Sequence, residues 1–361
     1  MQLFRRPPHF ITLIACATAV VGLPLSACGP AATPTPAPTP TPPYGLPPLA
    51  LPADEASHAF QTEWWYFNVQ LVSESGARYA LHDVIFQVQE QVSERTLYVR
   101  QIGLAEAGAT THVTAERLRT VDRRLRSEGD GFEIAMGEGS MAGEGGEHYR
   151  LVGGAGGLTY DLSLTSMAPP LVHDDDGLVG FGEAGITYYY SRPRLGVAGT
   201  VTSSAGAEAV KGLGWLDKQW GDFQPVAVFW DWASVQLDDG TDLMLTNLRD
   251  VNGETIDEYA TLRKPGGTTH RLDAGAFVFE PTGATWHSDR TGTTYETHWH
   301  VAVPDAGLDF TLEPLVRASE FASGLLGVVY WEAGTDAVDS GGNRIGQGFI
   351  ELNWARSLPF Q

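Results

Sequence analysis

Cysteine is nearly absent from this chain of 361 residues, which contains only Cys16 and Cys28. Cys16 lies in an N-terminal segment that we expect to be removed, so Cys28 is the only cysteine of the mature chain. A single cysteine excludes an intramolecular disulfide and a zinc site made of cysteines. We expect its thiol to be lipidated, which also excludes a thiolate nucleophile.

Basic residues are scarce as well. The chain has 23 Lys and Arg against 44 Asp and Glu, a formal charge of −21. Removal of Arg5 and Arg6 with the N-terminal segment leaves 21 basic against 44 acidic residues, a charge of −23. Nucleic acids and anionic lipids are recognised by basic surfaces, so neither is expected as a partner.

Sequence motifs for nucleotides and for a serine nucleophile are missing. The chain has no Gly-x-Ser-x-Gly and no Gly-x-x-x-x-Gly-Lys. Residues 180–185 fit the dinucleotide pattern by letter, but a tyrosine-rich strand follows where a helix must begin. We therefore expect no cofactor.

The N-terminus reads as a processing signal. The apolar run Phe10–Leu23 is short for a membrane span, which needs about 20 residues. It ends at Leu25-Ser26-Ala27-Cys28, which is similar to a bacterial lipobox. We predict a lipoprotein signal peptide at 1–27, lipidation of Cys28, a Pro/Thr-rich spacer at 28–53 and an extracytoplasmic, membrane-anchored protein. An ordinary secretory signal and a membrane anchor are the alternatives.

One segment occurs twice. Trp64–Leu71 returns as Trp230–Leu237, and Gly76–Leu81 is matched by Gly240–Leu245. This period is far longer than the roughly 20–50 residues of a solenoid repeat, so it indicates a duplicated domain. We predict an N-terminal domain at 54–205 and a C-terminal domain at 206–361.

Short strands separated by turn residues fill both halves, which is typical of all-β sandwiches or barrels. Only Thr114–Ser127 could hold a helical turn. The clearest strands are expected at Ala80–Val88, Thr96–Leu104, Gly157–Leu164, Ile186–Tyr190, Met244–Leu248, Thr294–Val303 and Gly348–Trp354.

Alternation within the repeat separates two faces. One face is aromatic and then amide, and the other is apolar except for one carboxylate per copy, Glu63 or Asp231. Burial would raise the pKa of such a carboxyl and suit it to act as an acid, although it could equally be a satisfied structural group. The first face carries Trp64, Tyr66, Asn68 and Gln70, matched by Trp230, Trp232, Ser234 and Gln236.

A second cluster spans Gly214–Asp222, just before the second copy of the repeat. As a strand it would present Trp215, Asp217 and Gln219 on one face, near the junction of the domains. Ligand sites favour such junctions, although a structural corner is the alternative. In Tyr188-Tyr189-Tyr190, one hydroxyl could donate a proton, or all three could simply pack.

Other polar groups give weaker evidence for a functional site. His82 and Asp83 point to opposite strand faces, so they form no dyad. Glu296, His298 and His300 share a face, but no further strong ligand is in view, so no metal site is predicted. Asp174–Gly177 resembles half a calcium loop and is expected to be a turn.

Together these motifs resemble the AttH-type lipocalin-like family related to carotenoid 1,2-hydratase, over roughly residues 54–355. The resemblance implies two tandem lipocalin-like antiparallel β-barrels. It rests on His58 with Glu63-Trp64-Trp65-Tyr66, Tyr189-Tyr190-Ser191, Gly214–Gly221, Asp231-Trp232 with Gln236-Leu237, Tyr330-Trp331-Glu332 and Gly346–Leu352.

The resemblance also implies a hydro-lyase-like activity on a lipophilic, alkene-bearing molecule, without a cofactor. We expect Asp217, Glu63 and Tyr189 to be catalytic, with Asp217 or Glu63 as the proton donor. The substrate would contact Trp64, Trp65, Tyr66, Gln219, Trp220 and Trp232. The alternative is a carrier that hands an unaltered lipophile to a membrane transporter.

Overall fold

The computed structural model describes residues 43–353 except 91–94, 109–111, 123–124 and 126–128. The chain divides into two compact units, 1–42 and 43–361, and the second contains the whole described fold. The predicted signal peptide, Cys28 and most of the spacer lie outside the described residues.

The first sheet is antiparallel, with the order β4-β3-β2-β1-β12-β11-β8-β7-β6-β5, and β9 and β10 pair with β11. Its strands are β1 (Thr62–Ser73), β2 (Arg78–Gln89), β3 (Thr96–Glu106), β4 (Val113–Val121), β5 (Gly131–Met136), β6 (Gly139–Glu144), β7 (His148–Ala155), β8 (Leu158–Ser166), β9 (Leu171–Val172), β10 (Leu178–Gly180), β11 (Gly185–Ser203) and β12 (Gly206–Phe223).

The second sheet has the order β16-β15-β14-β13-β24-β23-β21-β20-β17, with β22 on β23. Its strands are β13 (Val228–Leu237), β14 (Asp242–Asp250), β15 (Thr255–Arg263), β16 (Thr269–Asp273), β17 (Val278–Pro281), β20 (Trp299–Val303), β21 (Leu308–Pro314), β22 (Glu320–Ala322), β23 (Val329–Asp339) and β24 (Arg344–Asn353). A separate hairpin joins β18 (Thr285–His287) to β19 (Thr294–Glu296), and short 3-10 turns occupy Pro43–Gly45, Ala53–Glu55, Gly182–Ala184, Pro225–Ala227 and Pro304–Ala306.

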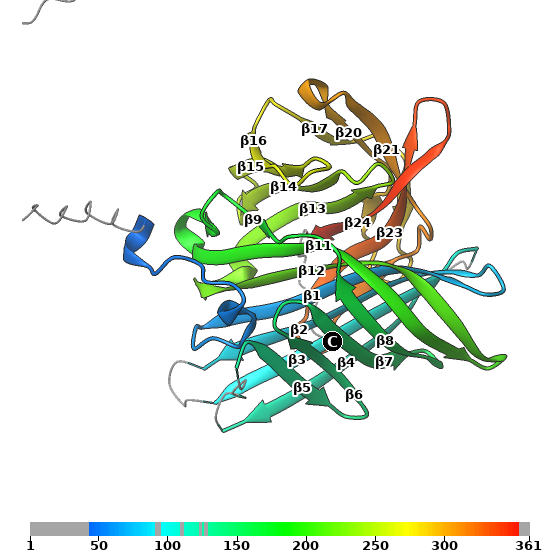
Figure 1. Ribbon diagram of the computed structural model, residues 1–361, viewed down its shortest axis with the longest axis horizontal. Helices are drawn as coiled ribbons and strands as arrows, with labels where there is room; N and C mark the ends of the chain where they lie inside the picture. Colours follow the sequence, from blue (N-terminus) through cyan, green and yellow to red (C-terminus); the bar gives the residue numbers. More distant parts are fainter. Residues whose placement is uncertain (1–42, 91–94, 109–111, 123–124, 126–128, 354–361) are drawn as a thin grey trace, which may run out of the picture. The chain divides into compact units, whose positions relative to one another are not determined.

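The two sheets share one topology, which confirms the duplication. In each, the first strand pairs with both the second and the last strand: β1 with β2 and β12, and β13 with β14 and β24. Figure 1 shows the first sheet in blue to green and the second in yellow-green to red. The fold is all-β, with two curled antiparallel sheets that form tandem lipocalin-like barrels, as predicted.

Two sequence expectations differ from the topology. The predicted division after residue 205 falls at the turn between β11 and β12, which both belong to the first sheet. Because β12 pairs with β1, the first sheet extends to Phe223, and the chain passes to the second sheet at 224–227. The helical turn expected at 114–127 is wrong for its first part, because pairing with β3 makes Val113–Val121 a strand.

The alternation in the repeat is confirmed by the cores. Trp65 and Phe67 lie in the core of the first barrel, and Ala233 and Val235 in that of the second. The opposite strand faces pack in a third cluster that joins the two sheets, and we call this region the seam. It includes Trp64, Tyr66, Ala80, Val84, Tyr189, Trp215, Trp232, Met244, Leu248, Tyr259 and Phe349.

Hydrogen bonds cross the seam reciprocally. Gln70 donates to two carbonyl groups of the second sheet, and its repeat equivalent Gln236 donates to two carbonyl groups of the first. Asn68 and Ser234 are also equivalent, and Asn68 Nδ2 donates to Ser234 Oγ over 3.2 Å. The two halves therefore pack like the subunits of a two-fold dimer, in which each partner offers the other the same surface.

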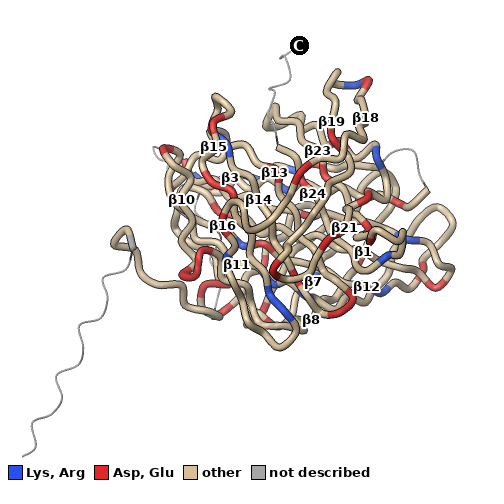
Figure 2. Tube along the Cα trace, turned by 90° about the horizontal axis from the view of Figure 1, so that it is seen from above, with Lys and Arg blue, Asp and Glu red and all other residues tan. Residues whose placement is uncertain are grey.

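Lys and Arg positions are scattered among the strands and outnumbered by acidic ones (Figure 2). Within the part of the chain that the structure describes, no helix has the length and apolar character needed to cross a membrane.

Candidate functional site

A cavity of about 280 Å³ lies at the seam, and we call it the main cavity. Strands of both sheets form its wall. Its described lining residues are Thr62, Trp64, Tyr66, Val84, Phe86, Val88, Val99, Gln101, Phe181, Tyr189, Asp217, Gln219, Pro225, Val228, Phe229, Trp230, Trp232, Thr246, Leu248, Tyr259, Leu326, Val328, Tyr330, Glu332, Glu351 and Asn353.

The wall is mostly aromatic and aliphatic, but it contains three carboxyl groups. Asp217 and Glu332 are only 4% and 3% exposed, and Glu351 is half-buried because its side chain faces the cavity. The described lining residues include no Lys, Arg or His. No basic group of the wall therefore compensates these carboxyl groups if they ionise, and they keep protons more readily than carboxyls in water.

The repeat explains why acids meet here. Asp217 on β12 lies opposite Tyr66 in the strand register, and Glu351 on β24 lies opposite Trp232. Tyr66 and Trp232 are equivalent in the repeat, so Asp217 and Glu351 are equivalent too. Each half thus contributes one acid of this equivalent pair to a single cavity on the pseudo-two-fold axis of the seam, and the second half adds Glu332.

Three hydrogen-bond donors surround the carboxyl group of Asp217. Tyr189 Oη donates over 2.5 Å, Ser191 Oγ over 2.5 Å and Trp215 Nε1 over 2.6 Å. Burial raises the pKa of Asp217 to about 6, and the three donors oppose this rise because they stabilise the carboxylate. Near neutral pH this group is mainly a carboxylate whose donors are fixed.

The donors of Asp217 are themselves held by neighbours. Trp232 Nε1 donates to Tyr189 Oη over 3.0 Å, across the seam. His173 Nε2 lies 2.7 Å from Ser191 Oγ, and its Nδ1 lies 2.8 Å from Thr261 Oγ1. Burial lowers the pKa of His173 to about 3, so the ring is neutral, and both of its nitrogens have partners.

Glu332 and Glu351 form a carboxyl pair on the other side of the main cavity. They are direct register partners on β23 and β24. Tyr66 Oη donates to Glu332 Oε1. Burial raises the pKa of Glu332 well above its usual value, and the charge of Glu351 raises it further. Burial also raises the pKa of Glu351 to about 7, partly opposed by a hydrogen bond from Trp230. The pair therefore retains a proton near neutral pH.

The main cavity thus combines a protonated acid with a carboxylate. Two carboxyl environments whose pKa values are pushed apart define separate acid and base roles, as in many hydrolases and isomerases. Aromatic faces around them can stabilise positive charge, each contact by about 0.5–2 kcal/mol. The arrangement suits a reaction that protonates an apolar substrate.

The exposed Leu326 marks where the main cavity meets the surface. This residue lines the cavity and is 44% exposed. Its loop belongs to the second barrel but is fastened to the first, because Glu116 accepts from Ser323 Oγ over 2.5 Å and from Leu325 N over 3.0 Å. Loosening this loop would widen the entrance.

The carboxyl pair predicts a pH dependence of stability. Its pKa values are higher in the folded than in the unfolded chain, so the folded chain binds more protons and the free energy of unfolding falls as pH rises through about 7. Buried histidines act oppositely only below their usual pKa of 6.5. Urea unfolding from pH 6.5 to about 8 should show a decrease of up to about 1.4 kcal/mol per pH unit and proton.

Replacement of Glu351 by Gln should flatten that decrease, because one titrating group of the pair is then gone. A wild-type profile that is already flat over this range would show that the pair ionises as readily in the folded chain as in the unfolded one.

The structure brings six of the predicted site residues together at the main cavity. They come from β1, β11, β12 and β13, and they are Trp64, Tyr66, Tyr189, Asp217, Gln219 and Trp232. Their functional roles stay predictions.

Glu63 lies elsewhere, as do Trp65 and Trp220. Glu63 is inside the first barrel, where it pairs with Lys218 and accepts hydrogen bonds from His58 N and Gln87 Nε2. Lys218 Nζ lies 4.1 Å from the ring centre of Trp65 and 4.8 Å from that of Trp220. Glu63 and Trp65 lie on the odd-numbered face of β1, which turns away from the seam, and Trp220 of β12 is the register partner of Glu63, so these three residues do not line the main cavity.

Asp231 is also a satisfied carboxylate, 2.6 Å from Arg249. Among the residues that the structure describes, no three or more His, Cys, Asp or Glu side chains are grouped so that they could hold a metal ion. His300 lies 3.1 Å from Asp309 on an exposed surface.

Sequence reasoning did not assign a role to Glu332 or Glu351. A signal for Glu351 was available, because Gly348–Asn353 (GFIELN) repeats Gly214–Gln219 (GWLDKQ) and places Glu351 where Asp217 stands. Glu332 has an equivalent in Ser191, since each faces the acid of its own half across the register. Because the two equivalent positions carry different residue types, the sequence gives no signal for Glu332.

Tandem barrels with an acid-bearing cavity at their junction define a double-barrel protein of the lipocalin-like class. The family model for AttH-like proteins matches residues 42–354. The chain belongs to the AttH-like family.

Solved structures agree with this assignment. An AttH protein from Nitrosomonas europaea is 26% identical, with a TM-score of 0.77, and the match covers 88% of this chain and 100% of that one. Kievitone hydratase from Nectria haematococca is 16% identical with a TM-score of 0.66, covering 86% and 94%, and shares the fold. CghA with Sch210972 is 13% identical with a TM-score of 0.52, covering 82% and 89%. Curated protein sequences contain no match.

Proposed function

We propose that the main cavity catalyses the hydration or isomerisation of a neutral, alkene-bearing lipophile without a cofactor. The observation that carries this proposal is the carboxyl pair, which keeps a proton in an aromatic cavity, facing the hydrogen-bonded carboxylate of Asp217. The hydratase-like fold of the family supports it. A non-catalytic pocket for the same lipophile would need neither acid.

The reaction uses the two sides of the main cavity in turn. A proton leaves the carboxyl pair and binds one alkene carbon, and the cation formed at the other carbon faces aromatic rings and the Asp217 carboxylate. Water then adds to that carbon, and the proton that the water loses returns to a cavity carboxylate. In isomerisation, a neighbouring carbon loses the proton instead.

This assignment differs from the sequence prediction that Asp217 or Glu63 donates the proton. Three donors aimed at Asp217 stabilise its charged form, so it suits the cationic intermediate better than the donor role. Tyr189 is assigned to holding the carboxylate and not to protonating the substrate, because its hydroxyl already donates to Asp217.

Incubation with neutral acyclic isoprenoid alkenes in ¹⁸O-labelled water tests the proposal. Mass spectrometry should find products that have gained one labelled water, or isomers of unchanged mass. A protein that stays inert towards a broad panel while binding its members would instead be the carrier, and its ligand should co-purify unaltered from the native host.

The charge of the main cavity predicts which ligands it takes. A terpene alcohol such as geraniol should bind at least about ten-fold more tightly at pH 8 than geranic acid, a difference of about 1.4 kcal/mol. The carboxylate ligand would add a fourth acid to a wall that has no basic group among its described residues. Quenching of Trp64, Trp230 and Trp232 fluorescence measures both affinities. Equal or tighter binding of the acid would contradict this charge argument.

The location of the protein is part of the same proposal. Cleavage before Cys28 and lipidation of its thiol would anchor the fold outside the cytoplasm, at the end of a proline-rich spacer. Cys28→Ser should then move the full chain from the membrane fraction to the soluble fraction. Retention of that variant in the membrane fraction would argue for an uncleaved anchor.

A further inference from the structure

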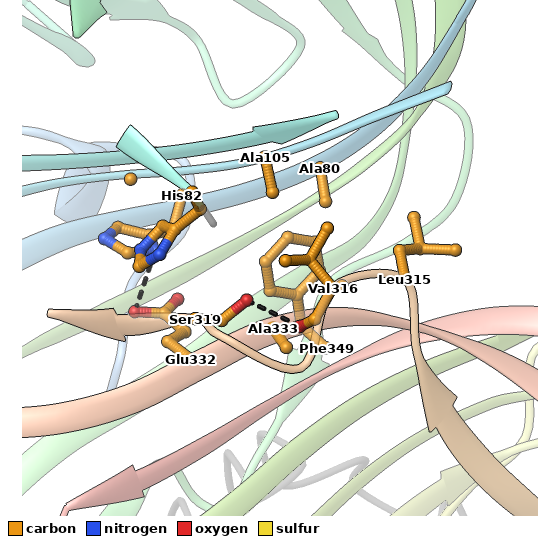
Figure 3. Close-up of a pocket in the computed structure, with 12 residues that line it drawn as sticks. Ala80, His82, Ala105, Leu315, Val316, Ser319, Glu332, Ala333 and Phe349 are labelled. Carbon is orange, nitrogen blue, oxygen red and sulfur yellow. Dashed lines mark hydrogen bonds and ion pairs between the residues drawn. The ribbon is translucent and has the colours of Figure 1, made fainter. Parts of the chain in front are cut away.

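A second, smaller cavity of about 10 Å³ lies directly behind Glu332 (Figure 3). It is enclosed by β2 and β3 of the first sheet, by β23 of the second, and by residues 315–319, which connect β21 to β22. Its polar lining residues are His82, His112, Ser319 and Glu332. The small cavity and the main cavity therefore lie on either side of one carboxyl group.

Hydrogen bonding fixes where the proton of Glu332 sits. Tyr66 Oη donates to Oε1, and His82 Nδ1 lies 3.1 Å from Oε2. Burial keeps Glu332 protonated and His82 neutral near pH 7, so this is a contact between two neutral groups. With Oε1 accepting from Tyr66, the carboxyl proton sits on Oε2 and points to Nδ1. The His82 ring must then carry its own proton on Nε2.

His82 Nε2 is an unused donor. The side chain is 2% exposed, and this nitrogen has no hydrogen-bond partner among the described residues. Buried polar groups of this kind are rare because an unmade hydrogen bond costs about 1–3 kcal/mol, and a water often supplies the partner.

Two acceptors complete the small cavity. His112 Nδ1 lies 3.1 Å from the carbonyl oxygen of Ala318, which can only accept, so His112 Nε2 is left as an acceptor. That nitrogen also lacks a partner among the described residues. Ser319 Oγ donates to Val316 O over 2.7 Å and keeps a lone pair free. A buried water typically makes about three hydrogen bonds and needs at least about 10–15 Å³, which this site provides.

We propose that the small cavity binds one water molecule, which accepts from His82 Nε2 and donates to His112 Nε2 and Ser319 Oγ. His82 is then a positioning residue, through which Glu332 exchanges its proton with solvent. The proton leaves Oε2 for Nδ1 while Nε2 passes its own proton to the water. The water in turn protonates His112 Nε2, which is itself buried, so that His112 carries a proton on both nitrogens. Because the His112 side chain is only half-buried, a movement of the ring then releases one of these protons to solvent. Uptake of a proton runs the same steps in reverse.

The described residues give Asp217 no such route. Its histidine, His173, has partners on both nitrogens, and Thr261 at the far end is 1% exposed. Protons can therefore reach the main cavity through Glu332 even when an apolar ligand fills the cavity. The inference requires that Glu332 lines the main cavity and does not require that the reaction proposed above occurs.

NMR spectroscopy of the full chain with ¹⁵N-labelled histidine tests the water site. His82 should be the Nε2–H tautomer at pH 7, with a cross-peak from that proton to water. Its exchange with solvent should be at least about ten-fold faster than that of His173 Nε2–H, which serves as an internal control. A proton on His82 Nδ1, or exchange as slow as that of His173, would overturn the water site.

Gly103→Ala tests the route without changing a titratable group. A Cβ at Gly103 would lie 2.3 Å from His82 Cε1, so the ring must leave its place beside Glu332. The infrared band of the protonated Glu332 carboxyl group is assigned by its loss in Glu332→Gln. In D₂O, this proton should exchange about ten-fold more slowly in Gly103→Ala than in the wild type. If Gly103→Ala does not fold, His82→Phe removes the same link.

Unchanged exchange in a folded variant would overturn the route. Neither measurement needs a substrate, so the outcomes separate from those of the proposed reaction. If the protein is inert towards alkenes but exchanges this proton rapidly, the proton route is supported and the proposed reaction is contradicted.

Discussion

Glu332→Gln is expected to lower kcat/KM for the alkene substrate by about 10²–10⁴-fold, the range typical of a lost general acid. Glutamine keeps the shape of the side chain. Its amide oxygen can still accept from Tyr66, and its amide nitrogen can donate to His82 Nδ1. The free energy of unfolding at pH 7 should therefore stay within about 1 kcal/mol of the wild type, and ligand affinity should change little.

Two comparisons make this result decisive. Glu258→Gln, on an exposed position of β15, makes the same chemical change away from the cavity and should have no effect on either quantity. Asp217→Asn should lose both activity and stability, because its amide nitrogen would replace one of the two accepting oxygens and face either Tyr189 Oη or the donors of Ser191 and Trp215. If Glu332→Gln stays fully active, the carboxyl pair is not the proton donor of the proposed reaction.

The second large effect is on folding. Glu63→Gln should lower the free energy of unfolding by about 3–5 kcal/mol, because it leaves the Lys218 ammonium group buried without a charged partner. Burial already lowers the pKa of Lys218, and the charge of Glu63 opposes that change. Urea unfolding at pH 7 measures the loss.

The double variant Glu63→Gln/Lys218→Met should recover most of this stability, since it removes both charges together. The exposed pair Arg150 and Asp161 lies in the same sheet and is a matched control, for which removal of one partner should be nearly neutral. Full stability of Glu63→Gln combined with loss of activity would restore the catalytic role that the sequence suggested for Glu63.

The fold could be predicted because its signals are local or repeated. Alternation at Trp64–Leu71 separates seam from core, and the second copy at Trp230–Leu237 shows that the pattern is used twice. The site was predicted in part for the same reason, since Trp64, Tyr66 and Asp217 lie on one face.

The placements that the sequence did not predict depend on contacts between distant residues. Glu63 looks like an isolated acid until Lys218 is placed beside it, and that pairing follows from the β1–β12 register. Likewise, Glu332 contacts Tyr66 and His82 of the first barrel only because the second barrel packs against the first. A local sequence pattern cannot supply a partner that comes from the other half of the chain.

The reciprocal glutamines of the seam have an evolutionary consequence. In a symmetric assembly of two separate copies, any change near the axis appears twice, so both ends of a shared pocket must stay chemically identical. Fusion of the copies into one gene removes that constraint while Gln70 and Gln236 still hold the old contact. One half could then keep Asp217 among three donors, and the other could acquire Glu332 beside Glu351. A fused chain can thus carry different carboxyl environments at the two ends of one pocket, which two identical copies cannot.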